Sequence, residues 1–185
     1  MGVALIVIAV IVVLLIVFVI AVYNGMVRSR NKVDEAWSGI DVQLKRRHDL
    51  IPNLVESVKG YAAHERETFQ AVTDARARAM GASGPAAVGA AEGMLSQALG
   101  RLFAVAEAYP QLRATENFQA LQAQLAETEN KIAVSRQVYN DTVLSYENAL
   151  ETVPTSVIAG IFGFRPRAYF ETDGAAREAP QVKFT

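Results

Sequence analysis

The 185-residue chain contains no cysteine. This absence excludes a disulfide framework, a Cys-ligated zinc site, an Fe–S cluster and a thiol nucleophile. Its two histidines, His48 and His64, fall about 160° apart on a continuous helix, so they cannot share a metal ion. The glycine-rich stretch at 81–93 lacks the Gly-Lys-Ser/Thr end of a phosphate-binding loop. We therefore expect no enzyme activity, no metal, no cofactor and no small-molecule substrate.

The sequence also lacks an excess of positive or negative charge, because its net charge is only −1. A protein that binds nucleic acid through its phosphates normally carries a clear excess of Lys and Arg. The sequence therefore gives no sign of a nucleic-acid partner.

An unbroken apolar run, VALIVIAVIVVLLIVFVIAV, occupies residues 3–22. Twenty helical residues span about 30 Å, the thickness of the hydrocarbon core of a bilayer. The run is too long for a signal peptide, and neither a basic start nor a good cleavage site accompanies it. We therefore expect a retained transmembrane anchor at residues 1–23.

Basic residues lie on only one side of this run. Arg28, Arg30 and Lys32 follow it, and no Lys or Arg precedes it. Because positively charged flanks stay in the cytoplasm, this asymmetry predicts an N-terminus outside and a cytoplasmic C-terminal domain. The same membrane-proximal basic residues would be attracted to an anionic leaflet.

Apolar residues between 33 and 72 keep a helical period for forty residues. On a helical wheel they occupy an arc of about 100°. Pro52 lies in the middle of this stripe, and proline disturbs a helix interior. We favour a single helix over about 24–80 that is kinked at Pro52. In the alternative, Asp49 caps a new helix whose first turn contains Pro52.

Further helices are predicted at about 86–108 and 115–152. The breaker cluster at 81–85 separates the first of them from the preceding helix, and Pro110 and Pro154 follow their ends. The expected fold is all-α: an N-terminal transmembrane helix, then an elongated antiparallel helical bundle of long helices over 24–154, then a short C-terminal helix and tail at 155–185.

Arg47 falls inside the apolar arc although it is charged. No acid occupies a neighbouring helical position, so we expect an ion pair with an acid on another helix, the candidates being Glu116, Glu127 and Glu129. In the alternative, its head reaches water past its apolar stem. Glu65 and Arg76 lie in the same arc and are candidates for the same kind of structural ion pair.

The C-terminal segment contains the apolar stretch SVIAGIFGF. Its large apolar side chains form a candidate interaction patch: Val157, Ile158, Ile161, Phe162 and Phe164. Either a short helix here closes the end of the bundle, or the patch is exposed for a partner, a neighbouring subunit or the membrane surface.

Several motifs resemble the LemA family of bacterial membrane proteins, and the resemblance covers nearly the whole chain. The longest block reads WSGIDVQLKRR at 37–47, DLIPNLVE at 49–56 and VKGYA at 58–62. Shorter motifs are YN at 23–24, HE at 64–65, AYP at 108–110, ENF at 116–118, TEN at 128–130, YN at 139–140 and GF at 163–164.

This resemblance implies a single-pass protein of the bacterial inner membrane with an all-α domain of bundle type. It implies neither an enzymatic activity nor an active site, and some relatives are linked to internal membrane compartments. Our leading hypothesis is a membrane-anchored helical scaffold that self-associates or organises proteins at the membrane. Its expected partners are the lipid bilayer and further copies of the chain. The alternative is an adaptor or regulator that docks one integral membrane protein, such as a protease or transporter.

Overall fold

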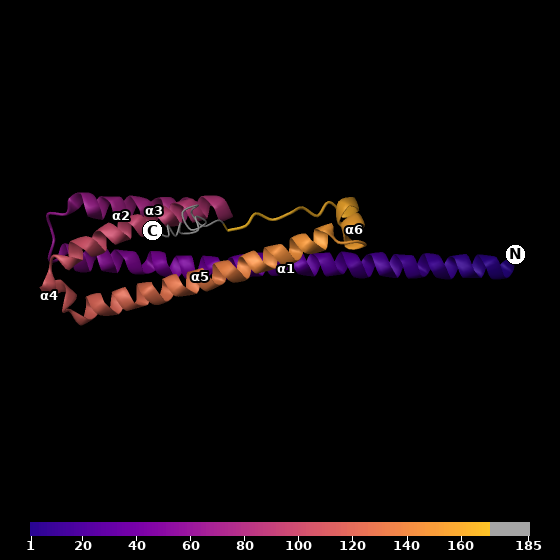
Figure 1. The fold of residues 1–185 in the computed structure, drawn as a ribbon, viewed down its shortest axis with the longest axis horizontal. Coiled ribbons are helices and arrows are strands. Elements are labelled where there is room, and N and C mark those ends of the chain that lie inside the picture. The colour runs from indigo at the N-terminus through magenta and orange to yellow at the C-terminus, as the bar shows by residue number, and fades with distance from the viewer. Residues whose placement is uncertain (171–185) are drawn as a thin grey trace, which may run out of the picture. The chain divides into compact units, whose positions relative to one another are not determined.

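The computed structural model describes residues 1–170, so the last part of the predicted C-terminal segment at 155–185, from residue 171 on, lies outside the described residues. The described part is all-α, as predicted, and contains no strand (Figure 1). Its helices are α1 (Gly2–Lys59), α2 (Arg66–Gly81), α3 (Pro85–Glu107), α4 (Pro110–Arg113), α5 (Glu116–Glu151) and α6 (Thr155–Phe162).

The chain divides into two compact units, each described by itself below. The first, the anchor unit, comprises Met1–Gly39 and Gln137–Ala168. The second, the bundle unit, comprises Ile40–Arg136 and Tyr169–Thr185, of which the last segment is described only to residue 170.

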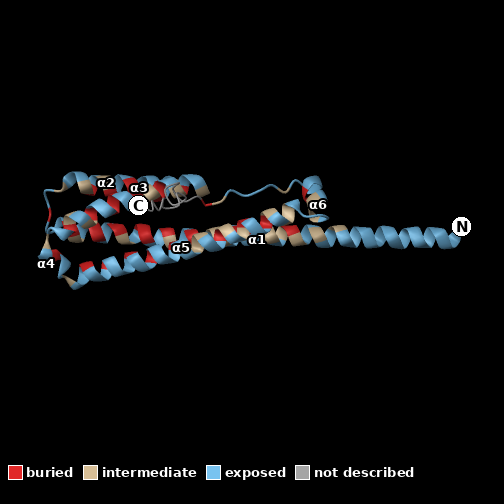
Figure 2. Cartoon of the chain, in the orientation of Figure 1, coloured by how far each residue is buried: buried red, intermediate tan, exposed pale blue. Residues whose placement is uncertain are grey.

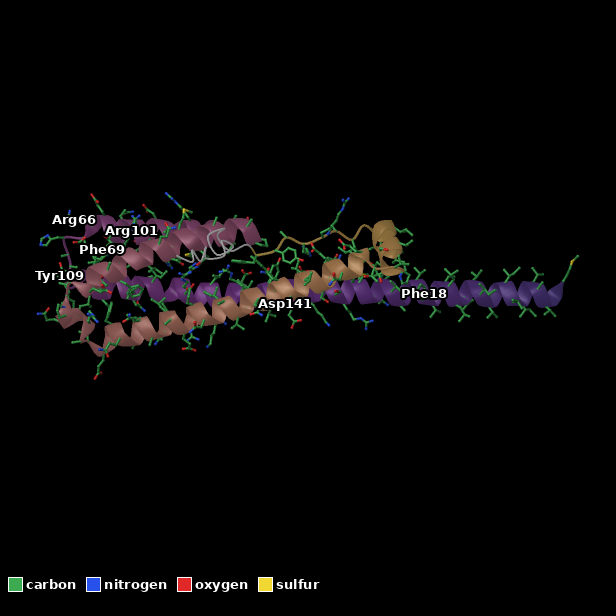
Figure 3. The ribbon with its side chains drawn as sticks, viewed as in Figure 1. Phe18, Arg66, Phe69, Arg101, Tyr109 and Asp141 are labelled. Carbon is green, nitrogen blue, oxygen red and sulfur yellow. The ribbon has the colours of Figure 1, made fainter. Side chains whose placement is uncertain are left out.

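The apolar run forms the first third of α1 and is uncovered on all sides. Its side chains stand out around the helix, as Phe18 does in Figure 3, and none of the most apolar 18-residue window is buried. Among the described residues, α1 is the one helix long and apolar enough to cross a membrane. A soluble core helix of this composition would be buried, because exposing so much apolar surface to water is unfavourable.

No break separates this run from the rest of α1. The helix continues without interruption to Lys59, which gives a length of about 87 Å at 1.5 Å per residue. The expected boundary near residue 23 is therefore not a helix boundary.

The prediction of one helix over 24–80 is wrong, because residues 60–65 separate α1 from a second helix, α2. In this turn the backbone N–H groups of Tyr61 and Ala62 both donate to the Val58 carbonyl oxygen, at 3.0 and 2.9 Å. Ala62 is only 1% exposed and belongs to the core. The apolar pattern kept its phase because the turn itself contributes a buried residue.

Pro52 lies inside α1, which continues through it. The alternative of a new helix capped by Asp49 is therefore wrong. A proline has no N–H, so the carbonyl oxygen four residues earlier, on His48, loses its helical donor. Arg76 of α2 replaces that donor, because its Nε donates to the His48 oxygen at 2.8 Å. A side chain from the neighbouring helix thus satisfies the carbonyl that the proline leaves free.

Pro52→Ala should raise the free energy of unfolding by roughly 1–3 kcal/mol, because the substitution restores a helical hydrogen bond and removes the ring clash. Thermal or denaturant unfolding of the full chain in mild detergent measures this. Arg76→Ala should cost more stability in the natural sequence than in the Pro52→Ala background, where the His48 oxygen has a donor again. A destabilised Pro52→Ala variant, or equal costs in both backgrounds, would contradict this account.

The bundle unit contains four long antiparallel segments. In Figure 1 the chain passes along the last third of α1, back along α2, forward along α3 and back along the first half of α5. α4 forms a single turn before α5. The buried residues of the core lie on the inward faces (Figure 2), and the largest fully buried members include Ile51, Leu54, Val58, Val72, Leu95, Leu102 and Leu112.

The anchor unit packs α1 against the second half of α5. Its buried residues include Met26, Val33, Tyr139, Val143 and Tyr146. The Trp37 ring meets the Tyr139 ring edge-on, with centroids 5.4 Å apart. Tyr139 also donates its hydroxyl to the carbonyl oxygen of Ala168 at 2.7 Å, which ties the segment after α6 to α5.

Tyr146 is fully buried, and among the described residues its hydroxyl has no hydrogen-bond partner. Burial raises the pKa of Tyr146, because the ionised phenolate is poorly solvated there. A pKa that is higher in the folded state favours the protonated phenol on folding, so the associated stability is lost as pH rises through that raised value.

Tyr146→Phe should therefore leave the free energy of unfolding unchanged or raise it by up to about 1 kcal/mol at neutral pH. The variant should also lose less stability than the natural chain above pH 10. Melting temperatures in detergent from pH 7 to 11 measure both effects, and Tyr61→Phe, at a 46% exposed position, is the control. A large loss of stability at neutral pH would show that the hydroxyl is needed.

Candidate functional site

A cluster of ionisable side chains is buried inside the bundle unit. Arg47 is 4% exposed and His48 7%, both on α1, and Glu92 on α3 is 7% exposed. Nη1 of Arg47 donates to Oε2 of Glu92 at 2.7 Å. The other oxygen of that carboxylate, Oε1, lies 2.6 Å from Nε2 of His48. One carboxylate therefore joins two neighbouring side chains of α1.

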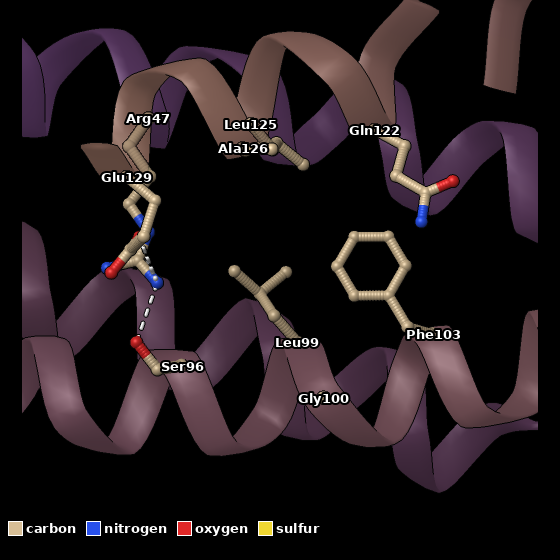
Figure 4. Close-up of a pocket in the computed structure, with 9 residues that line it drawn as sticks. All are labelled: Arg47, Ser96, Leu99, Gly100, Phe103, Gln122, Leu125, Ala126 and Glu129. Atoms are coloured by element: carbon tan, nitrogen blue, oxygen red, sulfur yellow. Dashed lines mark hydrogen bonds and ion pairs between the residues drawn. The ribbon is translucent and has the colours of Figure 1, made fainter. Parts of the chain in front are cut away.

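The Arg47 guanidinium has two further contacts. Its Nη2 donates to Oγ of Ser96, on α3, at 2.7 Å, and lies 3.3 Å from Oε2 of Glu129, on α5 (Figure 4). We call Arg47, His48, Glu92, Ser96 and Glu129 the Arg47 cluster. Because it joins α1, α3 and α5, the cluster fixes three of the four long segments of the bundle unit to one another.

The prediction that Arg47 meets an acid on another helix is confirmed, and the alternative in which its head reaches water is wrong. Glu129 was among the expected acids and Glu92 was not. Glu127 lies instead on the surface of α5, where Lys131 donates to it. That hydrogen bond holds the pKa of the Glu127 carboxyl below its usual value. Glu116 is exposed in the first turn of α5.

Glu65 and Arg76 do not form the expected ion pairs within the described residues. Glu65 is half-buried at the position before α2, and its side chain makes no capping hydrogen bond there. Arg76 donates to a backbone oxygen of α1, as described above. Arg76 therefore lies in the apolar arc because it donates to the carbonyl oxygen that Pro52 leaves without a helical donor, and not because it pairs with an acid.

Two small pockets flank the cluster. A pocket of about 340 Å³ lies beside Arg47, and its wall is mostly apolar, with Leu99, Phe103 and Leu125 among the lining residues (Figure 4). A second pocket, of about 250 Å³, reaches His48 between α1, α2 and the start of α3.

The chemistry available in these pockets is limited. Both oxygens of Glu92 are engaged, and no serine, threonine or cysteine lines the pocket that reaches His48. Its one lysine, Lys45, pairs with Asp49 at 3.2 Å. Residues 1–170 contain no group of three or more His, Asp or Glu side chains that could hold a metal ion together. The contacts of the Arg47 cluster therefore fit a structural ion network that joins helices.

A sequence signal for Glu92 does exist. On α3 the buried residues Val88, Glu92, Leu95 and Leu99 recur at helical spacing, so an acid occupies the apolar stripe of α3 just as Arg47 occupies that of α1. Two opposite charges, each inside an apolar stripe, indicate a buried pair. Ser96 gives no such signal, because a serine is ordinary at an exposed helical position.

The membrane-proximal basic residues, Arg28, Arg30 and Lys32, are exposed on α1 in the anchor unit. The residues of the C-terminal patch differ among themselves. Ile158 is buried and Phe164 is half-buried, whereas Val157, Ile161 and Phe162 are exposed. Most of the patch therefore faces outward, and only part of it packs against the unit.

Comparisons with known proteins give one family and a few relatives. The sequence pattern of the LemA family matches residues 36–184. Magnetosome protein MamQ 1 of Paramagnetospirillum magneticum is 28% identical over 175 residues, covering 80% of this chain and 64% of that protein. Protein LemA of Metamycoplasma hominis is 24% identical over 140 residues, covering 74% of this chain and 63% of that protein. The chain thus spans less than two thirds of the length of these relatives.

Proposed function

The chain belongs to the LemA family, and on that premise we propose that it is a non-catalytic helical scaffold anchored in the bacterial cell membrane. It self-associates and organises other proteins there. Relatives named as magnetosome proteins support a role in organising a bacterial assembly.

The observation that carries this proposal is the continuity of α1. One uninterrupted helix, Gly2–Lys59, contains the apolar run and also contributes a wall of the bundle unit. The helix that contains the apolar run is therefore the same helix that packs in the bundle unit. Such a continuous connection favours a structural role, because an anchor that merely tethers a soluble enzyme needs none.

The Arg47 cluster supports the same interpretation. Its buried charges contact one another, so they are used to join helices and not left available for a substrate. A buried ion pair often adds little net stability compared with apolar side chains, and we infer that this one specifies which helices pack together, which suits a scaffold of defined shape.

Size measurement of the full chain in mild detergent tests self-association. Light scattering should give a protein mass several times that of the 20.1 kDa chain and should change little on moderate dilution. A single copy at all concentrations would reject the scaffold. Crosslinking in native membranes would then decide for the adaptor if it captured one integral membrane protein in a fixed ratio.

The proposed orientation places the bundle unit in the cytoplasm. The chain has no cysteine, so a single introduced thiol reports its own side of the membrane. In spheroplasts an impermeant thiol reagent should label Gly2→Cys and should not label Ala63→Cys, in the exposed turn before α2, until the membrane is opened. Labelling of Ala63→Cys in intact spheroplasts would reverse the orientation.

A further inference from the structure

α6 lies level with the end of the apolar run, within the anchor unit. Its Phe162 ring is 4.9 Å from the ring of Tyr23, and the Phe164 ring is 5.7 Å from the same ring. Tyr23 is the first residue after the run at 3–22. These ring contacts hold the C-terminal helix at the position on α1 where the span ends.

The direction of the short helix α6 differs from that of the long helices α1 and α5. Figure 1 shows it lying across α1, not alongside it. A helix that crosses a membrane-spanning helix runs roughly parallel to the membrane plane. The end of α6 is well defined, because Gly163 adopts φ +72° and the Phe164 N–H donates to the Ala159 carbonyl oxygen at 3.0 Å.

One face of α6 is apolar and exposed. Ile158 and Ala159 face the anchor unit and are buried, whereas Val157 is 60% exposed and Ile161 73%. These two exposed residues are four positions apart and therefore share a face of the helix. Phe162 is 51% exposed despite its contact with Tyr23. The helix therefore presents apolar side chains that no described part of the chain covers.

We propose that α6 is an interfacial membrane helix, whose face formed by Val157 and Ile161 enters the lipid surface beside the transmembrane anchor. Interfacial helices lie in the membrane plane and bury one apolar face at the boundary between headgroups and acyl chains. The lipid surface is the expected partner of this face because α6 contacts Tyr23, the first residue after the apolar run. The bilayer is therefore the surface nearest to the exposed face of α6.

Basic side chains of the anchor unit fit an anionic lipid surface. Arg28, Lys32 and Arg165 are exposed in the same unit, and the guanidinium of Arg30 lies 5.6 Å from the centre of the Phe164 ring. Basic side chains next to an apolar helix face are typical of segments that bind anionic headgroups. Tyr23 also has the position of an interfacial aromatic anchor.

This inference rests on the anchoring part of the proposed function but not on self-association. Anchoring alone would leave α1 free to tilt and rotate in the bilayer together with its unit. A second attachment at α6 would fix the tilt and rotation of α1 relative to the bilayer.

Depth-dependent fluorescence quenching tests the proposal on the full chain. The protein is reconstituted into vesicles of phosphatidylcholine and phosphatidylglycerol, with one cysteine carrying the environment-sensitive dye NBD. The test position is Ile161→Cys. The matched control is Val138→Cys on α5, which is apolar and 52% exposed in the same unit but about 20 Å of helix before the end of α5. Val12→Cys inside the run reports insertion of the anchor.

Lipids brominated on their acyl chains should quench most of the fluorescence at position 161 and at position 12, and little at position 138. Aqueous iodide should show the reverse order. Quenching of position 161 by iodide and not by brominated lipid would overturn the proposal. So would protection of position 161 from both quenchers, because protein would then cover it. Absence of brominated-lipid quenching at position 12 would instead reject the anchor, so the two failures are distinguishable.

Discussion

Arg47→Ala is expected to lower the free energy of unfolding by roughly 3–5 kcal/mol, because it leaves a buried carboxylate without its cation. Glu92 loses its 2.7 Å partner and keeps only the contact with His48. The side chain of Arg47 is only 5% exposed, so its removal leaves the Glu92 carboxylate in a buried and poorly solvated position.

The neighbouring Arg46→Ala is the control. Arg46 is 45% exposed in its side chain and lies 3.9 Å from Glu127, and exposed pairs of this kind are worth about 0–1 kcal/mol. Unfolding of the natural chain and both variants by denaturant in the same detergent gives the comparison. Equal small losses would show that the Arg47 cluster contributes little to folding.

Replacing both members of the buried pair is expected to recover most of this loss. Glu92→Leu alone should also cost about 3–5 kcal/mol, because a buried guanidinium then remains with one largely exposed acid. Adding Arg47→Met to Glu92→Leu removes the second charge and fills the site with apolar atoms. Replacement of a buried ion pair by apolar side chains is often neutral or stabilising by about 1–4 kcal/mol.

The double variant should therefore be more stable than either single variant, and the coupling between the two positions should be several kcal/mol. Glu129→Gln serves as the comparison, because its carboxylate is 54% exposed and its loss should cost little. A double variant that loses the sum of the two single losses would show that the positions do not interact.

The helices were largely predictable from the sequence. The stripes and the prolines placed two helices at about 86–108 and 115–152, within a residue of α3 and α5. The turn at 60–65 was missed because its buried Ala62 continues the helical phase of its neighbours. Passage of α1 through Pro52 was left open, because the donor that makes it possible, Arg76, comes from another helix.

The candidate site was predictable only in part. Arg47 was found because a charge inside an apolar stripe requires a partner. Its main partner, Glu92, is 45 residues away, and no local pattern specifies which helix faces which. The C-terminal patch shows the same limit: composition identified its apolar residues, but the division into buried Ile158 and exposed Ile161 depends on how α6 docks against Tyr23.

The hydrogen bond from Arg76 of α2 to the carbonyl oxygen of His48 has an evolutionary consequence. Proline at 52 makes a donor at 76 useful, and a donor at 76 makes the proline tolerable, so position 76 is constrained for as long as position 52 is proline. A lineage that replaces Pro52 would relax the constraint on Arg76, whereas one that loses Arg76 first would pass through a weakened intermediate. The order of the two substitutions should thus be uneven, with changes at 52 preceding those at 76.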